Sequence, residues 1–234
     1  MRSPRAFISC SPLGRVGVST TARLLMDYFA YTGRDALAFD TDLHERPMAL
    51  RFPDSAPIDI GSVHGQIALF DRMLADDGLL KIVDVSNRCF EAFFAVSDKI
   101  GFFDEAERRG VEIFALFHVD GSDGSIRAAR RIAAQWPGVE LVIVENIGAS
   151  GLGELDPDLR DLYPAGSSLL VRALDPVLRK VVEDRDFSCF DFMIEPPEDM
   201  SIVVRAALRA WIGPVFEQLK VLELRIALRG SAFL

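Results

Sequence analysis

Residues 6–21 read AFISCSPLGRVGVSTT, and this stretch decides the fold. The apolar run 6–10 predicts a buried strand, and a loop with proline and glycines follows it over 11–17. Residues 18–31 then carry apolar side chains at helical spacing, and Gly33 marks the end of that predicted helix. A strand, a glycine-containing loop and a helix in this order are typical of the first unit of an α/β fold.

The rest of the chain repeats this alternation of apolar runs and helical patterns. Strands are expected over 36–39, 79–85, 111–119, 139–144 and 168–171. Helices are expected over 63–74, 126–136 and about 200–229, with a Phe-rich segment over 90–103 and a long loop over 148–166. No repeat, linker or composition break divides the chain. We therefore predict a single α/β domain over 1–234, with a mostly parallel, doubly wound sheet flanked by helices and a helical C-terminal segment from about 200.

The overall composition excludes several classes of protein. The 234 residues are 50% hydrophobic and carry a formal charge of −9, which fits a globular chain and excludes a disordered one. No apolar run approaches the roughly 20 residues of a membrane span, and no signal-peptide pattern opens the chain, so we expect a cytoplasmic protein. The acidic balance argues against general nucleic-acid binding. Cys10, Cys89 and Cys189 form no CxxC pair, which indicates neither a disulfide framework nor a zinc site.

In open parallel sheets a ligand binds beyond the carboxyl ends of the strands. Besides the loop after the first strand, the polar residues expected at that edge are Asp40, Asp42, Asp84, Asp120 and Asn146. These residues come from four later strands, so the sheet would gather them beside the loop.

The loop 13–20, LGRVGVST, together with its flanking strand and helix, resembles the deviant P-loop of ParA/MinD-like ATPases, which reads KGGVGK[ST]T. The pattern continues with Asp40-Thr-Asp42, with Asp84 at a strand end and with Asn146 after a late strand. Within that family, the order of these segments is similar to the TraL/StbB-like proteins of plasmid transfer and stability. The resemblance covers most of the chain and implies a P-loop NTPase fold, ATP or ADP with Mg²⁺ as cofactor, and a homodimer.

The resemblance also implies a role for each matching residue. Nucleotide-binding residues would be Gly14, Arg15, Val16, Gly17, Val18, Ser19, Thr20 and Asn146. Ser19, Asp40 and Asp84 would hold Mg²⁺, and Asp42 would orient the attacking water. Backbone N–H groups of such a loop and the helix N-terminus attract phosphate. Ordinary turn and helix-cap chemistry is the other interpretation of Asp40, Asp42 and Asn146.

Three departures from the family pattern weaken the implied nucleotide site. Leu13 stands in place of the signature lysine, Val18 in place of the phosphate-binding lysine, and Arg15 in place of a glycine, so we expect the loop to be reshaped. The first of the four lysines in the chain is Lys81. A charge-assisted bond to phosphate is worth about 1.5–3 kcal/mol. We therefore expect a degraded nucleotide site, very slow or absent hydrolysis, and a regulatory or interaction role with an unidentified protein partner.

Two alternatives stay open at this point. The first is a slow, partner-stimulated ATPase in partitioning, positioning or conjugal transfer, in which Arg15 takes over the role of the lysines. The second is an NAD(P)-binding oxidoreductase of Rossmann type. Pro12-x-Gly14-x-x-Gly17 lacks only the first glycine of the dinucleotide fingerprint, and Asp40 follows at the spacing of a ribose-binding acid.

Three further features have ordinary structural interpretations. His118 lies in an apolar run, which predicts a buried histidine with satisfied hydrogen bonds. The Phe-rich segment 90–103 predicts core packing. From Met200 onward the tail has five Lys and Arg against two Glu, and a solvated helix face explains this excess better than a surface for DNA or anionic lipid.

Overall fold

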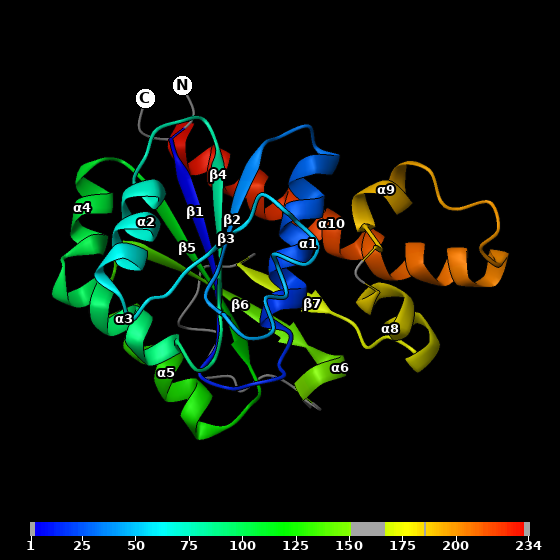
Figure 1. Ribbon diagram of the computed structural model, residues 1–234, viewed down its shortest axis with the longest axis horizontal. Coiled ribbons are helices and arrows are strands. Elements are labelled where there is room, and N and C mark those ends of the chain that lie inside the picture. The colour runs from blue at the N-terminus through cyan, green and yellow to red at the C-terminus, as the bar shows by residue number, and fades with distance from the viewer. Residues whose placement is uncertain (1–2, 151–166, 185, 232–234) are drawn as a thin grey trace.

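The computed structural model describes residues 3–150, 167–184 and 186–231. At its centre lies a seven-stranded sheet in the order β3-β2-β4-β1-β5-β6-β7 (Figure 1). Every neighbouring pair in the sheet is parallel, which confirms the predicted α/β class. The strands are β1 (Arg5–Cys10), β2 (Ala36–Asp40), β3 (Ala56–Pro57), β4 (Leu80–Val85), β5 (Glu112–Val119), β6 (Val139–Asn146) and β7 (Ser168–Val171).

Helices cover both faces of this sheet. α2, α3, α4 and α5 lie over one face, and α1 and the second half of α10 lie over the other (Figure 1). The described helices are α1 (Val18–Tyr31), α2 (Val63–Met73), α3 (Phe90–Lys99), α4 (Phe102–Arg108), α5 (Asp123–Gln135), α6 (Ile147–Ser150), α8 (Pro176–Glu183), α9 (Cys189–Ile194) and α10 (Ile202–Ser231). None of these helices combines the length and apolar character that crossing a bilayer requires.

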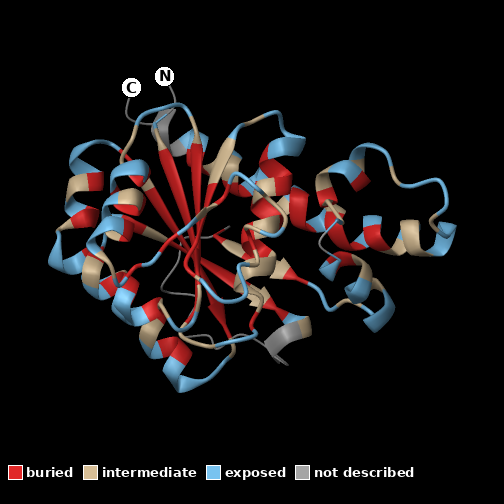
Figure 2. Ribbon diagram, viewed as in Figure 1, coloured by how far each residue is buried: buried red, intermediate tan, exposed pale blue. Residues whose placement is uncertain are grey.

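The central strands are buried on both faces, and Figure 2 shows them as a continuous buried layer. Along β1, Ile8 and Cys10 pack against the α2–α5 side, whereas Phe7 packs against the α1 and α10 side. In β4, Val83 and Ile82 divide between the two sides in the same way. Strands buried on both faces read as unbroken apolar runs, which is why the sequence pattern locates them. Polar chemistry is therefore concentrated at the strand ends.

The Phe-rich segment forms α3 and α4, and its aromatic side chains lie in the core as predicted. Phe94 stacks on Trp136 of the α5 C-terminus at a ring-centroid distance of 5.1 Å, and Phe70 of α2 meets Phe102 at 4.8 Å. The phenylalanine side chains of α3 and α4 are all buried, namely those of Phe90, Phe93, Phe94, Phe102 and Phe103. The segment is structural.

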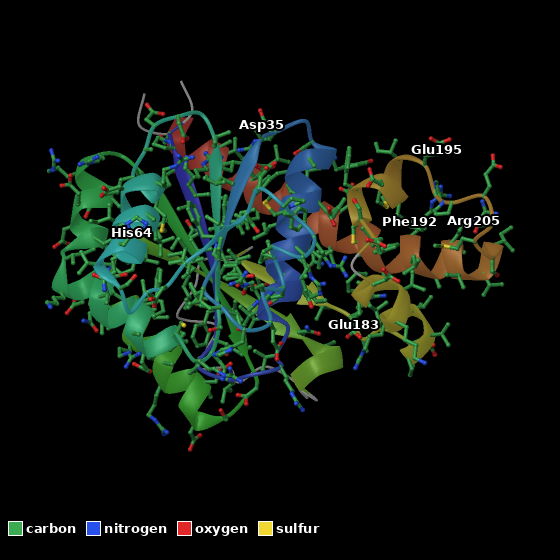
Figure 3. The ribbon with its side chains drawn as sticks, viewed as in Figure 1. Asp35, His64, Glu183, Phe192, Glu195 and Arg205 are labelled. Carbon is green, nitrogen blue, oxygen red and sulfur yellow. The ribbon has the colours of Figure 1, made fainter. Side chains whose placement is uncertain are left out.

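The sequence patterns give no prediction for α8 and α9. Together with the first half of α10 these helices form an arm beside the sheet, and Figure 3 labels Glu183, Phe192 and Arg205 on it. Of the predicted loop 148–166, only residues 148–150 are described, and they belong to the short helix α6 instead of a loop. The rest of the predicted loop lies outside the described residues. The expected strand over 168–171 is present as β7.

Candidate functional site

The loop after β1 crosses the carboxyl edge of the sheet and enters α1 at Val18. Gly17 precedes the helix with a φ of 95°, a left-handed conformation that favours glycine. A Cβ on Gly17 would collide with the Asn146 side chain at the end of β6, so the loop and Asn146 come together as predicted. The N-cap residue Gly17 has no side chain with which to cap the start of α1. Its first N–H groups are therefore available to a ligand.

Arg15 has a left-handed backbone conformation, which favours glycine. Its φ is 64°, so the backbone is left-handed although the residue carries a Cβ. The left-handed region costs a non-glycine residue roughly 1–2 kcal/mol. The turn at Arg15 is therefore strained, and the exposed Arg15 side chain lines the site.

A buried polar network fixes the loop from below. The Ser9 hydroxyl donates to the Val18 carbonyl at 2.8 Å, and Nδ1 of His118 lies 3.2 Å from the Val16 carbonyl. Nε2 of His118 lies 3.2 Å from Ser9 Oγ, while Ser11 Oγ donates to the His118 carbonyl at 3.0 Å. Burial lowers the pKa of His118 to about 4, so the ring is neutral at pH 7 and its Nδ1–H donates to Val16. His118 is buried as the sequence predicts, and its Nδ1 ties the loop to β5 through the Val16 carbonyl.

Asp84 ends β4 behind the loop and is the least satisfied polar group of the site. Its side chain is 2% exposed, and neither carboxylate oxygen has a hydrogen-bond partner among the described residues. Burial raises the pKa of Asp84 to about 7, and the nearby Ser19 hydroxyl opposes that shift without completing a hydrogen bond. A buried carboxyl left without a partner is costly, so it marks a place where a cation or donor can be bound.

Asp40 and Asp42 shape the loop that follows β2. Asp40 Oδ1 accepts from Asp42 N and Oδ2 accepts from Met48 N, each at 2.9 Å. Asp42 Oδ1 accepts from the backbone N–H groups of His44 and Glu45 at 3.0 Å. Asp42 also lines the pocket described below, whereas Asp40 is fully buried. Of the three predicted metal ligands, Asp40 is thus already bonded, and Ser19 and Asp84 are the pair with unused oxygens.

A pocket of about 820 Å³ opens beside the loop and brings most of the predicted site residues together. Its walls include Gly14, Arg15, Gly17, Val18, Ser19, Thr20, Asp42 and Asn146. Val16 is buried beneath the loop, and Asp40 and Asp84 lie behind it. The far wall comes from β7, α8 and α10, and Figure 3 labels Glu183 at this rim.

The pocket is rich in arginine, which the sequence patterns did not indicate. Its arginines are Arg15, Arg23, Arg88, Arg172 and Arg179. None of these five forms an ion pair with a carboxylate of the described residues, although the whole chain is acidic. Within the part of the chain that the structure describes, the carboxylates of the lining are fewer, namely Asp42, Glu45 and Glu183. An excess of cations around a concave site favours an anionic ligand.

No lysine replaces those that the loop lacks. Leu13 and Val18 line the pocket at the positions where the resembled family carries lysine. Lys81 is buried near the amino end of β4, where it is bonded to Asp77 and to the Leu79 carbonyl. That end of a parallel strand faces away from the carboxyl edge. The cations available to a ligand are therefore arginines.

Comparison with known proteins finds no family model and no curated protein that matches this sequence. Within the described ranges, no three His, Cys, Asp or Glu side chains lie close enough to hold a metal ion by themselves. The geometry of the loop, the pocket and Asp84 is therefore the basis for any functional inference.

The buried His118 predicts a specific pH dependence of stability. The pKa of His118 is about 4 in the folded chain and about 6.5 when unfolded, so protonation favours unfolding below pH 6.5. Relative to a His118→Gln variant, the wild type should lose about 1.4 kcal/mol of unfolding free energy per pH unit between pH 6 and 4.5. Urea unfolding at each pH measures this difference. A difference that stays constant with pH would contradict the buried neutral imidazole.

Asp84 predicts a pH dependence of stability that is opposite in sign to that of His118. Its pKa is raised from 3.8 to about 7, so ionisation costs the folded state free energy as the pH rises through this range. In protein freed of divalent metal, Asp84→Asn should stabilise the fold at pH 8 by up to about 4 kcal/mol and have little effect at pH 4. Thermal unfolding across this pH range measures the effect. Asp76→Asn, at an exposed position, is the control and should leave the melting temperature unchanged.

Proposed function

We propose that this chain is a ParA/MinD-like P-loop protein that binds a nucleoside polyphosphate weakly and hydrolyses it very slowly or not at all. In this proposal it acts in the cytoplasm as a regulatory or interaction module. The observation that carries it is a left-handed loop before α1 beside a pocket whose described lining holds five arginines and no lysine, with no ion pair from these arginines to a carboxylate of the described residues. The arginines attract phosphate, but Val18 leaves the loop without the cation that faces the terminal phosphates.

Ser19 and Asp84 fit a Mg²⁺ ion that arrives with the phosphates. Mg²⁺ prefers oxygen ligands and keeps several waters, so one hydroxyl and one nearby carboxylate suffice from the protein. Asp84 has two unbonded oxygens and faces Ser19. The ion would neutralise phosphate charge in this corner of the pocket, and the cation would remove the cost of burying Asp84 in its charged form.

The geometry supports this proposal over an NAD(P) site for two reasons. β4 lies between β1 and β2, whereas the Rossmann order places the second strand directly beside the first. Both oxygens of Asp40 are also bonded to backbone N–H groups, which leaves this carboxylate unsuited to holding a ribose. The slow ATPase with Arg15 in the lysines' role remains the second candidate, because Arg15 is exposed and lines the pocket.

Restoring the missing lysine tests the proposal. Val18→Lys places an amine at the first residue of α1, and Val63→Lys makes the same change at the first residue of α2, away from the pocket. Calorimetric titration should show weak MgATP binding to the wild type, at least tenfold tighter binding to Val18→Lys, and no change with Val63→Lys. Phosphate release should stay near background in the wild type. Rapid turnover that Asp42→Asn abolishes, or binding of NAD without ATP, would contradict the proposal.

We also propose a homodimer that forms without nucleotide. In the family that the chain resembles, subunits pair across the nucleotide through the lysine that Leu13 replaces. Leu13 cannot make that charged contact, so pairing cannot depend on it. Light scattering should give the same mass with and without MgATP. A change from monomer to dimer only after ATP is added would contradict this expectation.

A further inference from the structure

Arg23 differs from the other arginines of the pocket. Arg15, Arg88, Arg172 and Arg179 are exposed, whereas Arg23 is half-buried on α1. An exposed guanidinium is well solvated and needs no partner, but a cation removed from water needs compensation. Among the pocket cations, Arg23 is therefore the one whose position requires an anion.

Helical geometry directs Arg23 toward the loop. It follows Ser19 by four residues and Thr20 by three, so the three side chains share one face of α1. Side chains on a helix lean toward its N-terminus, which brings the guanidinium over the first turn. Its Nη2 lies 3.4 Å from Thr20 Oγ1. The Arg23 guanidinium thus lies beside the first turn of α1, whose backbone N–H groups can bind a phosphate.

The surroundings of Arg23 leave most of its donors unused. The contact with Thr20 occupies one of the five guanidinium N–H groups. No carboxylate of the described residues lies within ion-pair distance. Burial and the neighbouring Arg51 lower the pKa of Arg23 to about 10, while Asp84 and Asp27 act in the opposite direction at longer range. The group stays charged at pH 7 but lacks a counter-ion.

We infer that Arg23 is the principal phosphate-binding cation of this site and supplies, from the second turn of α1, the charge that Val18 does not. The inference rests on the proposed function and names the residue on which the affinity depends. A phosphate beside Ser19 and Thr20 would meet a planar fork of N–H donors as well as the helix N-terminus. The ligand class is a polyphosphate, since several phosphate oxygens are needed to contact the Arg23 guanidinium and the N-terminus of α1 at once.

Titration of three variants tests this inference. Arg23→Gln removes the charge, Arg23→Lys keeps it without the planar fork, and Arg127→Gln removes one positive charge from the exposed surface of α5 as a control. The probes are MgATP, inorganic triphosphate and adenosine. Arg23→Gln should weaken both phosphate probes by about 10- to 100-fold, Arg23→Lys by a smaller factor, and Arg127→Gln by less than twofold. Arg15→Ala should have a smaller effect than Arg23→Gln.

Separate outcomes distinguish the two proposals. If the wild type binds neither MgATP nor triphosphate, the proposed function fails and this inference fails with it. If the wild type binds both and Arg23→Gln binds them equally well, only the inference about Arg23 is wrong. A lower melting temperature of Arg23→Gln without ligand, with unchanged affinity, would assign Arg23 a purely structural role. Should Arg23→Gln fold poorly, Arg23→Met takes its place, because it removes the charge but keeps an apolar stem, and unchanged affinity in Arg23→Met would overturn the inference.

Discussion

The backbone between β1 and α1 depends on hydrogen bonds made beneath it. Ser9 and His118 bond the carbonyls of Val18 and Val16 from inside the sheet, where no water competes. Bonds of this kind are costly to break because each would leave a buried polar group unsatisfied. They fix the direction of the loop, and with it the direction of the first N–H groups of α1. The pocket lies at this edge, with the loop and the start of α1 in its wall.

Two kinds of cation can hold phosphate at such a loop, and the pocket of this chain offers arginine rather than lysine. A lysine within the loop would place a point charge against the terminal phosphates, whereas Val18 places an apolar side chain there. The arginines come from the loop itself, from α1, from the segments after β4 and β7, and from α8. Most of these guanidinium groups are exposed and carried by long side chains, so they surround the pocket without being fixed in one position. Mobile cations of this kind attract a polyanion but position a reacting phosphate poorly, which fits nucleotide binding better than hydrolysis.

The local parts of the fold could be predicted from the sequence, and the tertiary parts could not. α1 begins and ends where its pattern indicates, because Gly17 and Gly33 interrupt a clear helical period. The isolation of Asp84 could not be predicted, since it depends on how β2 and β1 flank β4 in the sheet. The role proposed for Arg23 has one signal in the sequence, because Arg23 lies one helical turn after Ser19. That signal becomes meaningful only once the pocket shows which face of α1 is open.

The arm of α8, α9 and the first half of α10 belongs to the site, because the contacts that hold it come from residues next to the pocket. Asp27, one turn after Arg23 on α1, accepts from the Cys189 N–H at 2.9 Å and so fixes the start of α9. Arg51, from the loop after β2, donates to the carbonyls of Val182 and Phe187 at the end of α8. Burial raises the pKa of Asp27 to about 6, and the bonds from Cys189 and Ser188 oppose that shift. The helix that follows the loop thus also contacts the arm, and α8 of that arm lines the opposite side of the pocket.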